Sequence, residues 1–94
     1  MAKVKQDQVP PIKIGQDFID KSNCRNVPLK FGIEADEGSE FQVTLSTNET
    51  FTIKIGKTGI YESDDYLKFY SIVYTKAGDV KTKDPVFDYV IGGK

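Results

Sequence analysis

Hydrophobic and polar residues alternate at every second position over much of this chain. In segment 29–35, each odd-numbered residue is Leu, Phe, Ile or Ala, and each even-numbered residue is Lys, Gly or Glu. Segments 41–45 and 51–55 repeat the alternation on either side of a short polar stretch. A period of two is typical of β-strands that bury one face. The strands predicted in this way are 12–15, 29–35, 41–45, 51–55, 60–61, 66–75 and 86–91.

The stretches between these segments are rich in Asp, Glu, Gly, Ser and Asn, which favour turns. Segment 16–28 is irregular, and its short polar side chains favour a loop or a single helical turn. No segment sustains the 3.6-residue period of an amphipathic helix. The pattern predicts an all-β fold, a small antiparallel β-sandwich of jelly-roll or immunoglobulin-like type with about seven short strands.

The chain has 94 residues, the length of one domain. Its start is polar and unpatterned as far as Pro10 and Pro11, which stiffen the entry to the first predicted strand. We therefore expect a flexible N-terminal arm (1–11), a single β-sandwich domain (12–91) and a flexible C-terminal end (92–94).

Segment 66–75 differs from the other predicted strands because both of its faces are apolar. Leu67 and Phe69 share one face, and tyrosines occupy most of the other. Either a β-bulge near 70–71 shifts the alternation, or both faces are covered. Tyrosine suits protein interfaces, although aromatic residues on strands more often pack in a core, so a second core layer is the alternative. The candidate interface residues are Tyr66, Tyr70, Ile72 and Tyr74.

The overall charge is balanced: 13 basic and 14 acidic residues give a net charge of −1. This balance argues against nucleic acid or an anionic membrane as the partner, since phosphate contacts need a local positive excess. No apolar run approaches the roughly 18 residues of a membrane span, and we expect no signal peptide. The single cysteine, Cys24, cannot form an internal disulfide, which favours a reducing compartment of synthesis.

Candidate chemistry is sparse. The chain has no histidine, and Cys24 has only carboxylates and lysines available as activating partners. Two acidic clusters offer oxygen ligands for Ca²⁺, but their spacing fits no known calcium loop, so solvated turns are the simpler interpretation. We expect no catalytic residue, no cofactor and no metal, and hence no enzymatic activity. The two clusters are Asp36, Glu37 and Glu40, and Glu62, Asp64 and Asp65.

The tripeptide Gly56-Lys57-Thr58 matches the closing residues of a phosphate-binding P-loop. A P-loop needs another glycine five positions before the first of these, where this chain has Phe51. It also needs a following helix to donate backbone amides to phosphate, whereas "GIYESDD" favours none. We therefore predict a turn between two strands, with Gly56 and Gly59 available for positive φ angles.

The stretch "ETFTIKIGKTGIYE" (49–62), with the later "SIVY" and the terminal "DYVI", resembles a C-terminal β-module with the signature GxTGIYE. That module occurs in tail and other virion structural proteins of phages and prophages from Gram-positive bacteria. The resemblance covers roughly the second half of the chain and leaves residues 1–47 unmatched. The signature residues are Gly56, Thr58, Gly59, Ile60, Tyr61 and Glu62, and further matches are Phe51, Ser71, Ile72, Asp88 and Tyr89.

The resemblance implies a non-enzymatic assembly or adaptor domain that acts through protein–protein contacts. Its partners would be copies of itself or other virion proteins, and it would reside in a virion assembled in the cytoplasm of the host bacterium. The alternative is a carbohydrate- or cell-surface-binding β-sandwich module. In that module Tyr66, Tyr70 or Tyr74 would stack on a glycan, although the absence of tryptophan weakens this interpretation.

Overall fold

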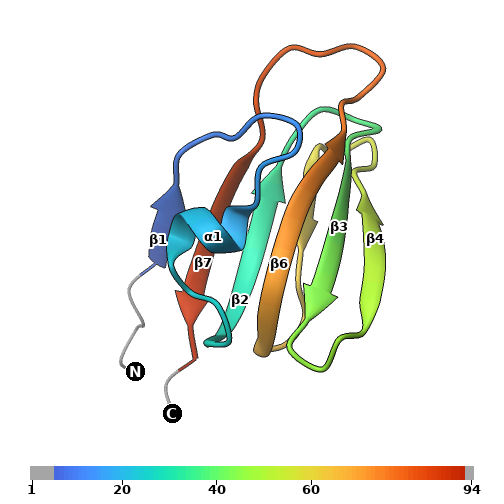
Figure 1. The fold of residues 1–94 in the computed structure, drawn as a ribbon. Coiled ribbons are helices and arrows are strands. Elements are labelled where there is room, and N and C mark those ends of the chain that lie inside the picture. The colour runs from blue at the N-terminus through green and yellow to red at the C-terminus, as the bar shows by residue number, and fades with distance from the viewer. Residues whose placement is uncertain (1–5, 93–94) are drawn as a thin grey trace.

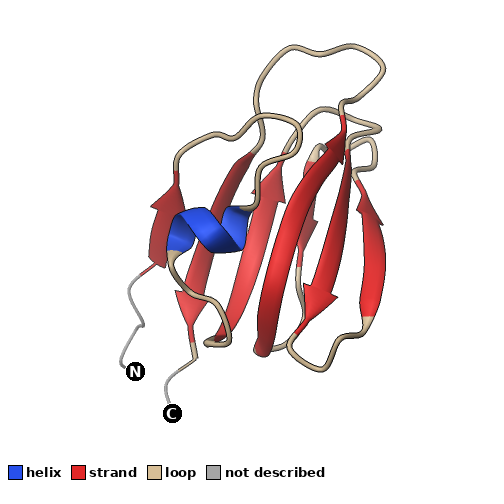
Figure 2. Ribbon diagram, viewed as in Figure 1, coloured by secondary structure: helices blue, strands red, loops and turns tan. Residues whose placement is uncertain are grey.

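The structure is a computed structural model in which residues 6–92 are described. It confirms the all-β class: seven antiparallel strands and one short helix, α1 (Phe18–Ser22), make up the fold (Figures 1 and 2). The strands are β1 (Gln6–Val9), β2 (Pro28–Glu34), β3 (Glu40–Leu45), β4 (Thr50–Lys54), β5 (Ile60–Glu62), β6 (Leu67–Lys76) and β7 (Val86–Ile91).

The strands form one curled sheet in the order β1-β7-β2-β6-β3-β4, with β5 paired to β2. Strand β2 holds the two parts of the sheet together. Its first residues pair with the start of β6, where Leu29 lies opposite Leu67, and its last residues pair with β5, where Ile33 lies opposite Tyr61. Strand β6 thus leaves β2 after a short contact and continues along β3, so the sheet curls around a single core.

Aromatic side chains fill this core. Phe18 of α1 lies between Phe41 of β3, 5.9 Å away between ring centroids, and Phe87 of β7, 4.7 Å away. Phe31 of β2 packs edge-on against Phe69 of β6 at 5.2 Å. All five rings are buried. The helix therefore closes the core between two strands that do not pair with one another.

Of the two alternatives for the apolar faces of segment 66–75, the structure shows the β-bulge near 70–71. Thr44 lies opposite Ser71, yet the next residue of β3, Leu45, lies opposite Phe69, which leaves Tyr70 as the extra residue. The bulge changes which positions face inward: Phe69 is buried before it, and Ile72 is buried after it. One strand therefore shows two phases of alternation.

The N-terminal part differs from the prediction. Gln6–Val9 is not an arm but an edge strand paired with β7, and Val9 is buried. Residues 1–5 of the predicted arm and 93–94 of the predicted end lie outside the described residues. Segment 12–15 is not a strand, because Gly15, at φ +90°, turns the backbone. Backbone pairing holds β1 in place without an alternating apolar pattern, so its polar sequence concealed it.

The residues before α1 cover the second edge of β6. The Gly15 amide donates to the Tyr74 carbonyl at 2.8 Å, and the Tyr74 amide donates to the Gln16 carbonyl at 3.0 Å. Asp17 continues this contact with its side chain: Oδ1 accepts 2.9 Å bonds from the backbone amides of Ile72 and Ile19. The bond from Ile19 makes Asp17 the N-cap of α1, and Asp17 has the extended backbone conformation that is usual for an N-cap.

Candidate functional site

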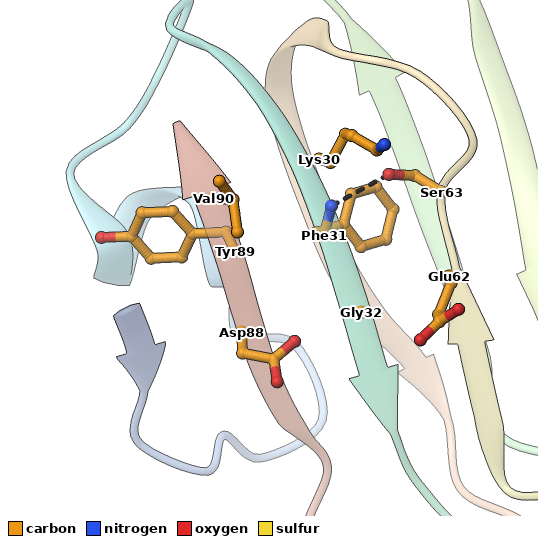
Figure 3. A pocket seen from close by; sticks show the side chains of 8 residues that line it. All are labelled: Lys30, Phe31, Gly32, Glu62, Ser63, Asp88, Tyr89 and Val90. Atoms are coloured by element: carbon orange, nitrogen blue, oxygen red, sulfur yellow. Dashed lines mark hydrogen bonds between the residues drawn. The ribbon is translucent and has the colours of Figure 1, made fainter. Parts of the chain in front are cut away.

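A polar groove of about 310 Å³ lies on the outer surface of β7, β2 and β5 (Figure 3). The register of these strands places Asp88 and Glu62 on opposite sides of Gly32, each directly across from it. Two interstrand spacings separate the two acidic residues, or about 10 Å between their Cα atoms. A carboxylate therefore lies on each side of Gly32, which forms the bottom of the groove.

Gly32 makes room for this arrangement. A Cβ atom at that position would lie 2.9 Å from Asp88 Oδ1 and 3.9 Å from the Glu62 side chain. The alternation of β2 directs position 32 outward, so a longer residue there would fill the groove. The missing side chain thus gives the groove its depth.

Donor groups line the same groove. Ser63 Oγ accepts a 2.9 Å bond from the Phe31 amide, which leaves its own hydroxyl proton free for another acceptor. Lys30 supplies an ammonium group and lies 5.2 Å from the ring centroid of Tyr66. Carboxylates, a hydroxyl and an ammonium in one open groove can bind a polar, hydroxyl-rich ligand through mixed hydrogen bonds.

The four candidate interface residues do not share a surface. Tyr66 and Tyr70 are exposed, with 44% and 53% of their surface accessible, but Ile72 and Tyr74 are buried at 0% and 1%. The interface prediction is therefore wrong for Ile72 and Tyr74, and the alternative of core packing holds for them. The bulge at Tyr70 is the physical reason, because it turns the even-numbered positions that follow toward the core.

The two exposed tyrosines have different neighbours. Tyr70 lies beneath Arg25, whose guanidinium carbon is 5.0 Å from the ring centroid and whose Nε donates to the Tyr70 carbonyl at 2.9 Å. Tyr66 contacts Lys30 beside the groove. The structure therefore assigns Tyr66 to the surroundings of the groove and Tyr70 to the surface near α1.

The structure confirms a turn at Gly-Lys-Thr-Gly. The Gly59 amide donates to the Gly56 carbonyl at 3.1 Å, and β5 follows at once. Gly59 has the expected positive φ, +75°, whereas Gly56 is not among the residues with positive φ. The other signature residues extend from this turn: Thr58 bonds to the Ile60 amide, Tyr61 packs on Phe31, and Glu62 reaches the groove.

The acidic turn at Asp36 serves the fold. Its carboxylate accepts bonds from the Thr82 hydroxyl at 2.5 Å, the Thr82 amide at 2.7 Å and the Lys83 amide at 3.2 Å. The hydrogen bonds from Thr82 hold the pKa of Asp36 below its ordinary value.

Cys24 is buried, and its thiol donates to the Ser22 carbonyl at 3.4 Å. Within residues 6–92, no three His, Cys, Asp or Glu side chains are placed to hold a metal ion together.

Sequence reasoning missed the groove because three separate strands build it. Asp88 and Glu62 are far apart in the chain, and although the resemblance included both residues, nothing in the sequence places them beside each other. The one available signal was Gly32, a glycine inside a strand of clean alternation, which often marks close approach of another group.

Comparisons with protein-family models, curated proteins and solved structures gave no match for this chain. In the described part of the chain, no helix has the length and apolar character needed to cross a membrane.

Proposed function

We propose that this chain is a non-enzymatic structural domain of a phage or prophage virion, or of its tail, that acts in assembly through protein–protein contacts. The observation that carries the proposal is an apolar hollow of about 420 Å³ beside the short contact between the first residues of β2 and the first residues of β6. Pro28, Leu45, Tyr66 and Leu67 are among the residues that line it. The GxTGIYE resemblance supplies the virion context.

The hollow lies where inward-facing side chains reach the surface. Leu67 is directly opposite Leu29, which is fully buried, so both have the inward orientation of the pleat. Yet 43% of Leu67 is accessible, and Ile91, also opposite Leu29, is exposed as well. Covering apolar surface contributes about 25 cal/mol per Å², so a partner seated here gains free energy from side chains that the fold leaves uncovered.

Static light scattering across a concentration series tests the assembly proposal. We expect a mass above the 10.5 kDa of one chain that rises with concentration. Leu67→Glu should lower the mass at every concentration, because it places a charge in the hollow. The matched control Val80→Glu, at an exposed apolar residue of the β6–β7 loop, should not.

A chain that stays at 10.5 kDa up to about 1 mM, the scale of the weakest specific contacts, would count against self-assembly. The virion context has its own test. Particles purified after prophage induction in the source bacterium should contain this chain by mass spectrometry, and its consistent absence would remove the virion assignment.

The groove supports a second candidate, a carbohydrate- or cell-surface-binding module. Glu62, Asp88 and Ser63 offer hydrogen bonds to sugar hydroxyls, and Tyr66 lies close to the same groove through Lys30. Tyrosine fluorescence titrated with bacterial wall polysaccharide should then saturate. Glu62→Gln should weaken the response, and Glu37→Gln, at an exposed residue that lines neither the groove nor the hollow, should not. An unchanged signal over the whole titration would remove this candidate.

A further inference from the structure

The free strand edges of this sheet are not equally protected. β1 and β4 lie at the two ends of the strand order (Figure 1). β1 is followed directly by Pro10 and Pro11, β5 has only three residues, and residues 15–17 cover the second edge of β6. β4 has none of these features, and its described pairing with β3 runs without a register shift. Proteins usually block such an edge, because it can pair with another strand.

Hydrogen bonds at both ends of the β3–β4 hairpin show which backbone groups face the open edge. The Leu45 amide donates to the Glu49 carbonyl at 2.8 Å, and the Ile55 amide donates to the Ser39 carbonyl at 2.9 Å. Bonded and non-bonded pairs alternate along an antiparallel ladder, so odd-numbered residues of β4 bond to β3. The N–H and C=O groups of Thr50, Thr52 and Lys54 therefore point away from β3.

We propose that β4 pairs antiparallel with β4 of a second copy of this chain, about a two-fold axis at Thr52. The inference rests on the proposed assembly function and names one of its contacts. In this register Thr52 lies opposite the partner's Thr52, and Thr50 lies opposite the partner's Lys54. All outward N–H and C=O groups of Thr50, Thr52 and Lys54 then find partners, as a two-fold interface requires.

The side chains of β4 fit this register. Phe51, 40% accessible at the rim of the core, would lie opposite the partner's Ile53 on the same face, so the pairing covers exposed aromatic surface. A shift by one residue would direct Phe51 to the wrong face. Lys54 is the one charged residue of β4 and meets a threonine, so no like charges face each other.

The composition of β4 favours the same outcome. Thr50–Lys54 alternates β-branched and aromatic residues with a single lysine, and it contains neither proline nor glycine. Such segments have a high tendency to form strands and to pair along an exposed edge. A second copy is the occupant that offers the same run of donors and acceptors in a self-complementary order.

Thr52→Pro tests the pairing directly. Proline removes the outward Thr52 N–H but no bond to β3, so the fold should persist, which circular dichroism checks. Thr52→Val keeps the N–H and the side-chain shape, and is the matched control. By analytical ultracentrifugation, we expect Thr52→Pro to raise the dimer Kd at least tenfold, an effect of about 1.4 kcal/mol, and Thr52→Val to leave it unchanged.

A second measurement covers the case in which Thr52→Pro does not fold. In the wild-type protein, hydrogen exchange at the amides of Thr50, Thr52 and Lys54 should slow as concentration rises. If the wild type associates while these amides stay unprotected, or while folded Thr52→Pro associates equally well, the β4 pairing is wrong and the assembly proposal stands. If the wild type stays monomeric throughout, the β4 pairing and self-assembly are both wrong, and the virion assignment is then decided by its own test. Combining Thr52→Pro with Leu67→Glu should give a 10.5 kDa monomer.

Discussion

Replacing Asp17 by alanine should be the most informative single change at the junction between α1 and β6. The carboxylate has two roles there: it caps α1 through the Ile19 amide, and it is the acceptor for the Ile72 amide on the edge of β6 that faces away from β3. Its other oxygen lies 3.4 Å from the Arg25 guanidinium. Alanine removes all three contacts at once.

The expected loss follows from these contacts. Removing an N-cap side chain costs about 0.5–2 kcal/mol, and leaving a partly buried amide without an acceptor costs about 1–3 kcal/mol. The ion pair with Arg25 is partly exposed to solvent, so its loss adds little to the change in unfolding free energy. We therefore expect Asp17→Ala to lose about 2–4 kcal/mol of unfolding free energy, out of the roughly 5–14 kcal/mol usual for 94 residues. The melting temperature should fall by about 10–30 °C.

Urea unfolding followed by circular dichroism near neutral pH measures this loss. Asp17→Asn keeps an oxygen acceptor and an equally good cap, so it should lose less than about 1 kcal/mol. Asp20→Ala, at the exposed acid of the same helix that lies 3.7 Å from Arg25, should stay within about 0.5 kcal/mol of the wild type. An Asp17→Ala protein as stable as the wild type, or equal losses for alanine and asparagine, would refute the role given to the carboxylate oxygen.

Three further changes should behave as follows. Phe18→Ala should cost about 3–5 kcal/mol in urea unfolding, since it empties the centre of the ring cluster. Gly59→Ala should cost about 1–2 kcal/mol, because φ is +75° and the new Cβ would lie 3.2 Å from a carbonyl oxygen, whereas Gly56→Ala, which meets nothing within 4 Å, should stay within about 0.5 kcal/mol. Equal effects of the two would contradict the turn geometry. Hydrogen bonds from Thr82 lower the pKa of Asp36 from its ordinary 3.8, so its stabilisation is present above that value and is lost as pH falls below it. The stability difference between wild type and Asp36→Asn should therefore shrink in acid unfolding below about pH 4, and a constant difference would argue against it.

The fold class was predictable because alternation reports directly on one-sided burial. Strands β2, β3 and β4 lie within a residue or two of the predicted segments, since apolar residues recur at every second position in each of them. Strand β1 escaped detection because pairing with β7 positions it through backbone bonds. The alternation of apolar residues carries no information about backbone bonds, so a polar edge strand cannot be predicted from it.

The candidate surface residues were harder to place. Alternation alone put Ile72 and Tyr74 on the same face as Tyr66, and the bulge invalidates this by adding one residue to the count. The sequence allowed a bulge as one of two explanations for the two apolar faces of segment 66–75. Which side chains a bulge exposes depends on the position of the extra residue, and the sequence does not determine that position. The groove around Gly32 depends on which strands become neighbours, and that information resides in the tertiary pairing.

The position of β7 has a consequence for how the chain reaches its native state. β7 lies between β1 and β2 in the sheet, although it follows all other strands in the sequence. During synthesis, β1 cannot pair until β7 has left the ribosome, and β2, which can already pair with β5 and β6, keeps its other side unpaired until then. Contacts of this sequence separation make folding slow, so the nascent chain should depend on protection from aggregation until the seventh strand arrives.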